Sequence, residues 1–330
     1  MEIPRIVVAP MANITTAAFV SEVCEAGALG FLGSAPMPIA VIEAQVAAIR
    51  ARTQRPFGMN FFVHEAPDAS APSIAAMRGR LAPMRAAKGV ADEVPAVAPP
   101  FGDAHLAVVL AARPAVVSFH FGLPDEAAMR TIKRAGIAAW SSATTVAEAR
   151  ELEARGVDAV IAQGAEAGGH RGMFLASLDE QTSTMALVPR VVDAVKVPVI
   201  AAGGIMDGRG IAAGLALGAA AAQLGTVFLG CPEAEVAPAY REALFSPQAA
   251  RTRVTTLLSG RPARAIVTPF LDELADLEGH AAPFPIQRGL AAPFSPSLWS
   301  GQGAPLTRAL PARELVAALA REAGLGPPGP

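Results

Sequence analysis

Short apolar runs alternate with longer amphipathic stretches along most of the chain. The runs are almost continuously apolar and are bounded by Gly, Pro or polar residues, which is typical of strands buried on both faces of a parallel sheet. We expect eight such strands, at residues 6–9, 29–32, 57–61, 115–119, 137–141, 159–162, 199–202 and 221–224. Helices are expected between them, at residues 15–26, 38–52, 125–134, 146–155, 186–194 and 208–216.

Eight strands that alternate with helices predict parallel βαβ units. A doubly wound sheet could absorb the same pattern. However, unusual residues follow the strands throughout the chain, and a barrel gathers all of these loops on one face. The predicted fold class is therefore α/β, a TIM (β/α)8 barrel with a small second (lid) domain.

The second domain is predicted from the point where the alternation stops, after Cys231. We expect a (β/α)8 barrel domain at 1–230, a small lid or substrate domain at 231–300 with one helix and a proline-punctuated loop, and a C-terminal helix at 301–330 that returns to the barrel. The stretch 63–113 is longer than one crossover needs, so it predicts an excursion with some extra helix.

Composition narrows the class of protein. Hydrophobic residues make up 52% of the 330 residues and charged residues 17%, which allows a large core and excludes disorder of the whole chain. A net charge of −2 with scattered basic residues gives no attraction to nucleic acid or to an anionic membrane. Abundant Ala and Arg beside little Lys hint at a high-GC bacterial source.

Two features bear on the compartment. Two cysteines, Cys24 and Cys231, are too few for a disulfide framework, and no signal peptide is recognisable, so we expect a cytoplasmic protein. The uncharged stretch 211–230 is about long enough to span a bilayer, but it is interpreted as a buried helix running into a buried strand.

The strongest chemical signal is a pair of glycine-containing loops after the seventh and eighth strands. The segments IAAGGIMDGRG and AAQLGTVFLG place Gly203, Gly204, Gly225 and Thr226 directly after buried strands. Barrels build phosphate sites from the backbone N–H groups of these two loops. We therefore predict a phosphate cradle; the alternative is that the glycines only make tight turns.

His170 follows the sixth strand in the segment AQGAEAGGHRG. An imidazole gains or loses a proton near neutrality, which suits an acid–base role beside a cofactor, although a lone histidine is often structural. Asn60 ends the third strand with an amide that can both donate and accept a hydrogen bond, and Met11 ends the first. The five histidines have no ligand-like spacing, so no metal is predicted.

Together these motifs resemble a known family. APM, PFGMNFF, VSFHFG, AQGAEAGGHRG, AAGGIMDGRG, QLGTVFLGCPEA and WSGQGAPL occur in order from about Val8 to Leu315, and they resemble class I nitronate monooxygenases, formerly called 2-nitropropane dioxygenases. The resemblance implies an FMN-dependent oxidoreductase that converts alkyl nitronates, such as propionate-3-nitronate, and O2 to carbonyl compounds and nitrite.

The same resemblance implies the site residues. The catalytic residue would be His170. The FMN site would comprise Met11, Asn60, Gln163, Gly168, Gly203, Gly204, Gln223, Leu224, Gly225 and Thr226.

The chain departs from the family pattern in the predicted lid. Many class I members carry Tyr-Asp-Ala-Thr-Lys after a Pro-Phe pair, whereas Pro283-Phe284 is followed here by PIQRGL. Two other functions stay open: an FMN-dependent enoyl-acyl-carrier-protein reductase that uses NAD(P)H, and a non-catalytic flavin-binding barrel. A homodimer is also left open.

Overall fold

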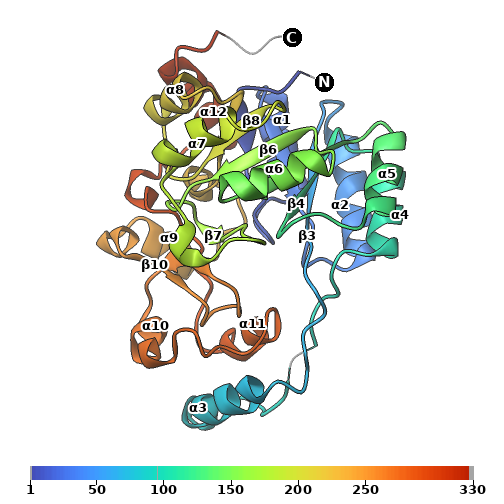
Figure 1. Cartoon of the computed structure of the whole chain (residues 1–330). Coiled ribbons are helices and arrows are strands. Elements are labelled where there is room, and N and C mark those ends of the chain that lie inside the picture. The colour runs from blue at the N-terminus through green and yellow to red at the C-terminus, as the bar shows by residue number, and fades with distance from the viewer. Residues whose placement is uncertain (1, 95, 327–330) are drawn as a thin grey trace.

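A closed parallel barrel forms the centre of the computed structural model, which describes residues 2–94 and 96–326. Its strands, in order around the barrel, are β1 (Ile6–Val8), β2 (Leu29–Gly33), β3 (Gly58–Phe62), β4 (Val116–His120), β5 (Ala138–Ala143), β6 (Ala159–Gln163), β8 (Val199–Ala202) and β9 (Ala221–Leu224). The barrel closes because β1 pairs in parallel with both β2 and β9. The predicted TIM-barrel fold is confirmed (Figure 1).

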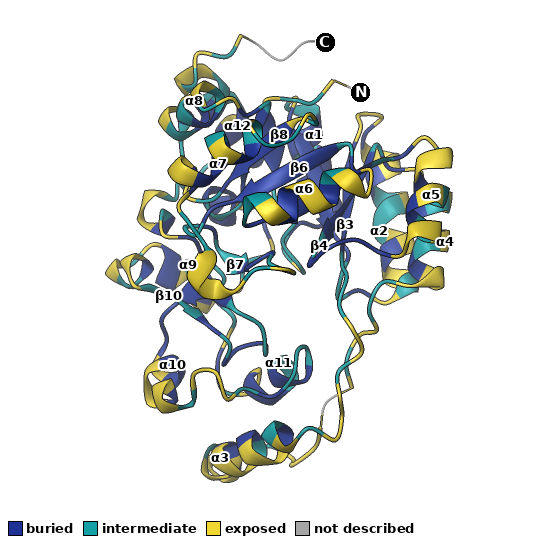
Figure 2. Ribbon diagram, in the orientation of Figure 1, coloured by how far each residue is buried: buried dark blue, intermediate teal, exposed yellow. Residues whose placement is uncertain are grey.

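Helices surround the barrel and turn one face to solvent. They are α1 (Ala17–Glu25), α2 (Ile39–Arg52), α4 (Asp103–Ala112), α5 (Glu126–Arg134), α6 (Val146–Ala154), α7 (Thr184–Val192), α8 (Gly208–Ala216) and the C-terminal α12 (Ala312–Glu322). Figure 2 shows buried strands inside helices whose outer faces are exposed. The six expected helices all form close to their predicted positions, and α12 packs against α1 and α8.

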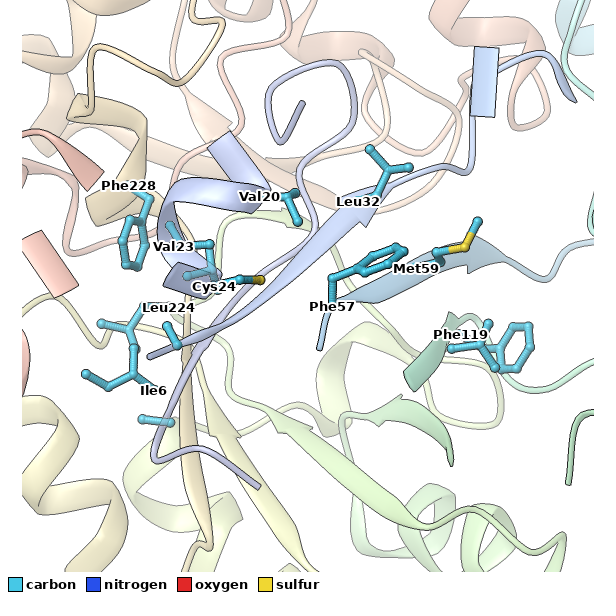
Figure 3. Close-up of a cluster of buried hydrophobic side chains, with 14 of the residues drawn as sticks. Ile6, Val20, Val23, Cys24, Leu32, Phe57, Met59, Phe119, Leu224 and Phe228 are labelled. Atoms are coloured by element: carbon cyan, nitrogen blue, oxygen red, sulfur yellow. The ribbon is translucent and has the colours of Figure 1, made fainter. Parts of the chain in front are cut away.

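Two apolar layers explain why the strands are apolar on both faces. Val7 points into the barrel interior, where it joins a cluster with Phe31 and Trp140. Its neighbours Ile6 and Val8 belong to the larger cluster between the barrel and the helices. Figure 3 shows this outer layer, in which side chains from the strands meet those of α1 and of the segment after β9.

The lid contains a small sheet that the sequence analysis did not predict. β10 (Thr252–Thr255) pairs antiparallel with β11 (Ala263–Ile266), and β11 pairs antiparallel with β7 (Gly169–His170), which belongs to the barrel loop after β6. The lid also holds α9 (Pro238–Leu244), α10 (Pro269–Glu273) and α11 (Ile286–Ala291). Short 3-10 turns complete the described chain: η1 (Leu178–Glu180), η2 (Thr226–Gly230), η3 (Pro247–Ala250), η4 (Ala275–Leu277) and η5 (Ala304–Leu306).

The excursion after β3 forms α3 (Pro72–Lys88), which lies away from the barrel beside α11 (Figure 1). Ile74, Met77 and Leu81 share an apolar cluster with Leu257 and Leu271 of the lid. The three-part division of the chain stays a prediction. By sequence, α3 lies within the predicted barrel domain 1–230, but it packs against the predicted lid 231–300.

The uncharged stretch 211–230 folds as a helix that runs into a strand, as expected, but the helix is not buried as predicted, because one face of α8 is exposed. It comprises most of α8, then β9 and η2. Across the residues that the structure describes, no helix combines the length and the apolar character needed to cross a membrane.

Candidate active site

A cavity opens at the carboxyl ends of the barrel strands, under the lid. The space it encloses, with the open mouth included, is about 1240 Å³. Segments after β1, β6, β8 and β9 contribute to its wall, as do residues of β3, β4 and β5 and the lid residues Arg288 and Trp299. This is the face on which barrels collect their functional loops.

The structure brings almost all of the predicted site residues to this cavity. His170 lines it together with Met11, Asn60, Gln163, Gly168, Gly203, Gly204, Gln223, Gly225 and Thr226. Leu224 does not line it. Its side chain is buried in the outer core, near Phe228 in Figure 3.

The loops after β8 and β9 present backbone donors. In the described part of the chain, no acceptor receives the N–H groups of Gly203, Gly204 or Gly225. Gly203 and Gly204 have φ angles of +116° and +71°, a region that a side chain disfavours. An anion is the usual partner for such a cluster of free N–H groups.

The side-chain amides of Asn60 and Gln223 differ in whether protein groups satisfy their hydrogen-bonding atoms. Asn60 donates through Nδ2 to the Ser118 hydroxyl (2.9 Å). The Oε1 atom of Gln223 is buried and has no partner within residues 2–94 and 96–326. Because a buried acceptor without a donor is costly, Gln223 has a free acceptor to offer a ligand.

Gln163, by contrast, holds the loop that carries His170. Its Nε2 atom donates to the His170 carbonyl (3.0 Å), and its Oε1 atom accepts from the Gly172 N–H (2.7 Å). Arg171, which was not predicted as a site residue, is buried and donates to the Gln163 carbonyl (3.0 Å). These bonds fix the backbone on both sides of the histidine.

The imidazole of His170 is neutral at pH 7. Burial is the main cause that holds its pKa well below the usual range, and nearby His120 and arginine side chains lower it further. Its Nε2 atom lies 2.9 Å from the Ser259 hydroxyl, which itself donates to the Arg261 carbonyl (3.1 Å). Ser259 therefore accepts from His170, so Nε2 carries the proton and Nδ1 is left as an acceptor.

A second histidine, His120, lies behind the first and was not predicted as a site residue. Its Nε2 atom donates to the His170 carbonyl (3.0 Å), which leaves Nδ1 to accept from the Ser142 hydroxyl (3.0 Å). Desolvation in the cavity wall lowers the pKa of His120 to about 4. Its position in VSFHFG, at the end of the fourth strand, was the available signal.

Aromatic rings surround His170. Centroid distances to its imidazole are 5.2 Å for Trp299, 5.4 Å for Phe284, 5.6 Å for Phe62 and 5.7 Å for Phe121. These walls exclude water from the imidazole, which explains the direction of its pKa shift.

Glu148, on α6, anchors the loop that follows His170. Its buried carboxylate accepts from the backbone N–H groups of Phe174 (2.7 Å), Leu175 (3.0 Å) and Ala176 (3.2 Å), and from Thr144. Sequence reasoning missed this role, because an acidic residue in a helix usually faces solvent. Among the described residues there is no group of three or more acidic, histidine or cysteine side chains that could hold a metal ion.

The fold and the cavity define a class: an α/β-barrel protein with a cavity at the carboxyl ends of its strands, where free backbone N–H groups and a buried histidine meet. A family model described as nitronate monooxygenase matches residues 1–322. The chain belongs to the nitronate monooxygenase family, which consists of flavoenzymes, and it is an oxidoreductase.

Individual relatives agree with this assignment. A nitronate monooxygenase from Paraburkholderia phytofirmans is 42% identical, over 96% of this chain and 91% of the relative. The structure of a nitroalkane oxidase from Streptomyces ansochromogenes has a TM-score of 0.89 at 39% identity, covering 98% of this chain and 96% of the other. FabK from Thermotoga maritima has a TM-score of 0.76 at 30% identity, covering 98% and 93%.

These similarities bear on the two alternatives. The likeness to FabK is more distant than that to the nitroalkane oxidase, so an enoyl-acyl-carrier-protein reductase is not favoured. A non-catalytic barrel is not favoured either, since the related proteins are named as enzymes.

Proposed function

We propose that this chain is an FMN-dependent nitronate monooxygenase that oxidises alkyl nitronates with O2 to carbonyl compounds and nitrite. One observation carries the proposal: in a chain of this family, the free N–H groups of Gly203, Gly204 and Gly225 line the same cavity as His170. FMN, when bound, supplies the electron acceptor for oxidation of the substrate.

The residues present fit this cofactor. The three glycine N–H groups suit a phosphate, and the unpartnered Oε1 of Gln223 suits an N–H at the edge of a flavin ring. At Gly168 a Cβ atom would lie 2.5 Å from the Gly301 nitrogen, so a side chain there would force apart two loops that line the cavity. The binding set of Met11, Asn60, Gln163, Gly168, Gly203, Gly204, Gln223, Leu224, Gly225 and Thr226 is part of the proposal.

His170 acts in the proposal as the catalytic residue. Its neutral ring with an unprotonated Nδ1 can remove the α-proton of a neutral nitroalkane, whereas a preformed nitronate needs no base. Ser259 keeps the ring in this tautomer, and the aromatic walls keep water away from the reacting carbon. Gln163 and His120 hold the histidine backbone in place.

The function is tested by oxygen consumption and nitrite release with propionate-3-nitronate, with and without NAD(P)H. We expect turnover that needs no NAD(P)H. Absence of nitrite, together with rapid anaerobic bleaching of the flavin by NADH or NADPH, would point to the reductase instead.

Two finer points belong to the proposal. A cytoplasmic location fits the two unpaired, buried cysteines, and a homodimer stays a prediction that size-exclusion chromatography with light scattering can test.

A further inference from the structure

Arg288 is a charged side chain in the cavity wall that has no ion-pair partner among the described residues. It lies on α11, and its guanidinium makes no hydrogen bond or ion pair with any residue that the structure describes. Its nitrogens are also not among the buried polar atoms without partners, so they keep contact with open space. Burial lowers the pKa of the guanidinium with no carboxylate to oppose the effect, and an arginine stays charged under these conditions.

The remainder of the wall has no charge to balance it. Among the described residues that line the cavity there is no Asp, Glu or Lys, and the only other titratable side chains are the neutral His120 and His170. A single cation in a largely apolar cavity attracts anions strongly, because little water or counter-charge screens it.

Arg288 reaches the cavity from the lid, whereas the proposed phosphate cradle belongs to the barrel loops. Its charge is one of the influences that lower the pKa of His170, which places it within electrostatic reach of the imidazole. Phe284 and Trp299 flank His170 on the same lid side. The surroundings of His170 thus combine apolar walls for an alkyl chain with the guanidinium of Arg288 in the cavity wall.

We propose that Arg288 binds a second anionic group of the substrate, so that the enzyme selects alkyl nitronates that carry a carboxylate on the alkyl chain. A guanidinium offers two parallel N–H donors that match the two oxygens of a carboxylate. This inference rests on the proposed function, and it assigns a specificity role to a residue in the PIQRGL stretch where the chain departs from its family's pattern.

The test compares Arg288→Met and Arg288→Lys with wild type on propionate-3-nitronate and on propyl-1-nitronate, which lacks the carboxylate. We expect Arg288→Met to lower kcat/KM for propionate-3-nitronate by about 10- to 100-fold, the effect of one charge-assisted hydrogen bond. The loss on propyl-1-nitronate should be clearly smaller, and Arg288→Lys should recover part of the selectivity. Arg130→Met, which removes an exposed arginine from α5, is the matched control for the change in net charge.

A binding measurement separates this inference from the proposed function. Succinate resembles propionate-3-nitronate in length and charge but cannot react, and butyrate lacks one of its carboxylates. Titration of each into the flavin-loaded enzyme is followed by the visible absorbance of the flavin. We expect wild type to bind succinate at least about tenfold more tightly than butyrate, and Arg288→Met to lose this preference.

Three outcomes would overturn the inference: no preference for succinate in wild type, an equal loss of kcat/KM on both nitronates, or loss of flavin from Arg288→Met. The last would instead assign the guanidinium to the cofactor phosphate. If no nitronate is turned over but the succinate preference depends on Arg288, the proposed function fails while the anion site stands.

Discussion

Mild acid should destabilise the fold through His120. This imidazole is half-buried in the cavity wall, and its pKa is lowered from 6.5 to about 4, with desolvation as the main cause and the nearby Arg261 and Arg171 as further ones. The folded state therefore favours the neutral ring, while the unfolded chain accepts a proton near pH 6.5. The stability that His120 contributes is complete above pH 6.5 and is lost as the pH falls towards 4.

The size of the effect follows from these two values. Within this interval each pH unit removes about 1.4 kcal/mol from the free energy of unfolding. Acidification from pH 6.5 to about pH 5 should thus cost on the order of 2 kcal/mol from His120 alone. His64 and His170 act in the same direction, since burial also lowers their pKa values.

Urea unfolding at about pH 7 and about pH 5, at constant flavin content, measures this loss. His120→Gln is the informative variant, because an amide can still donate to the His170 carbonyl but cannot titrate. The variant should be less stable than wild type at neutral pH and should lose less stability on acidification. An identical loss in both proteins would refute the assignment of a neutral His120.

Three further predictions concern the site. His170→Asn should keep its flavin but lose about 10²- to 10⁴-fold of its activity on neutral nitroalkanes and much less on preformed nitronates, measured as nitrite release; full activity on both would make the residue structural. Ser259→Ala, which removes the acceptor for His170 Nε2, should lower nitroalkane kcat by about tenfold, for one lost hydrogen bond, with unchanged flavin absorbance. Gly204→Val should lower flavin affinity by at least about tenfold, because φ is +71° and Cβ would lie 3.2 Å from the Glu166 side chain; a fully yellow variant would contradict the phosphate cradle.

The barrel was predictable from sequence because each strand is buried on both faces. Such strands are continuous apolar runs whose burial depends only on the strand itself, as in β6 and β8. The glycine loops were predictable for a related reason. A positive φ is a local backbone property, so Gly203 and Gly204 mark it in the sequence whatever surrounds them.

The lid was less predictable because its secondary structure depends on pairing with segments that are distant in the sequence. β10 and β11 are four residues long and contain arginines. They pair with each other, and β11 also pairs with β7, some 90 residues earlier in the chain. Nothing in the sequence near Ser259 indicates that its hydroxyl meets His170. In the same way, the packing of α3 against the lid and the position of Arg288 in the cavity wall depend on tertiary structure, so the local sequence does not indicate them.

Because β7 pairs with β11, the position of the His170 backbone depends on the fold of the lid. His170 lies opposite Ala263 in the register, and the N–H group of the next residue, Arg171, donates to the Pro262 carbonyl (2.9 Å). The backbone of the proposed catalytic residue is thus one edge of the lid's own sheet. A chimaera that imports residues 231–300 from a relative would change the substrate pocket and the support of the histidine in a single step. Altered selectivity in such a hybrid enzyme should therefore be judged together with its turnover of a small, unsubstituted nitronate.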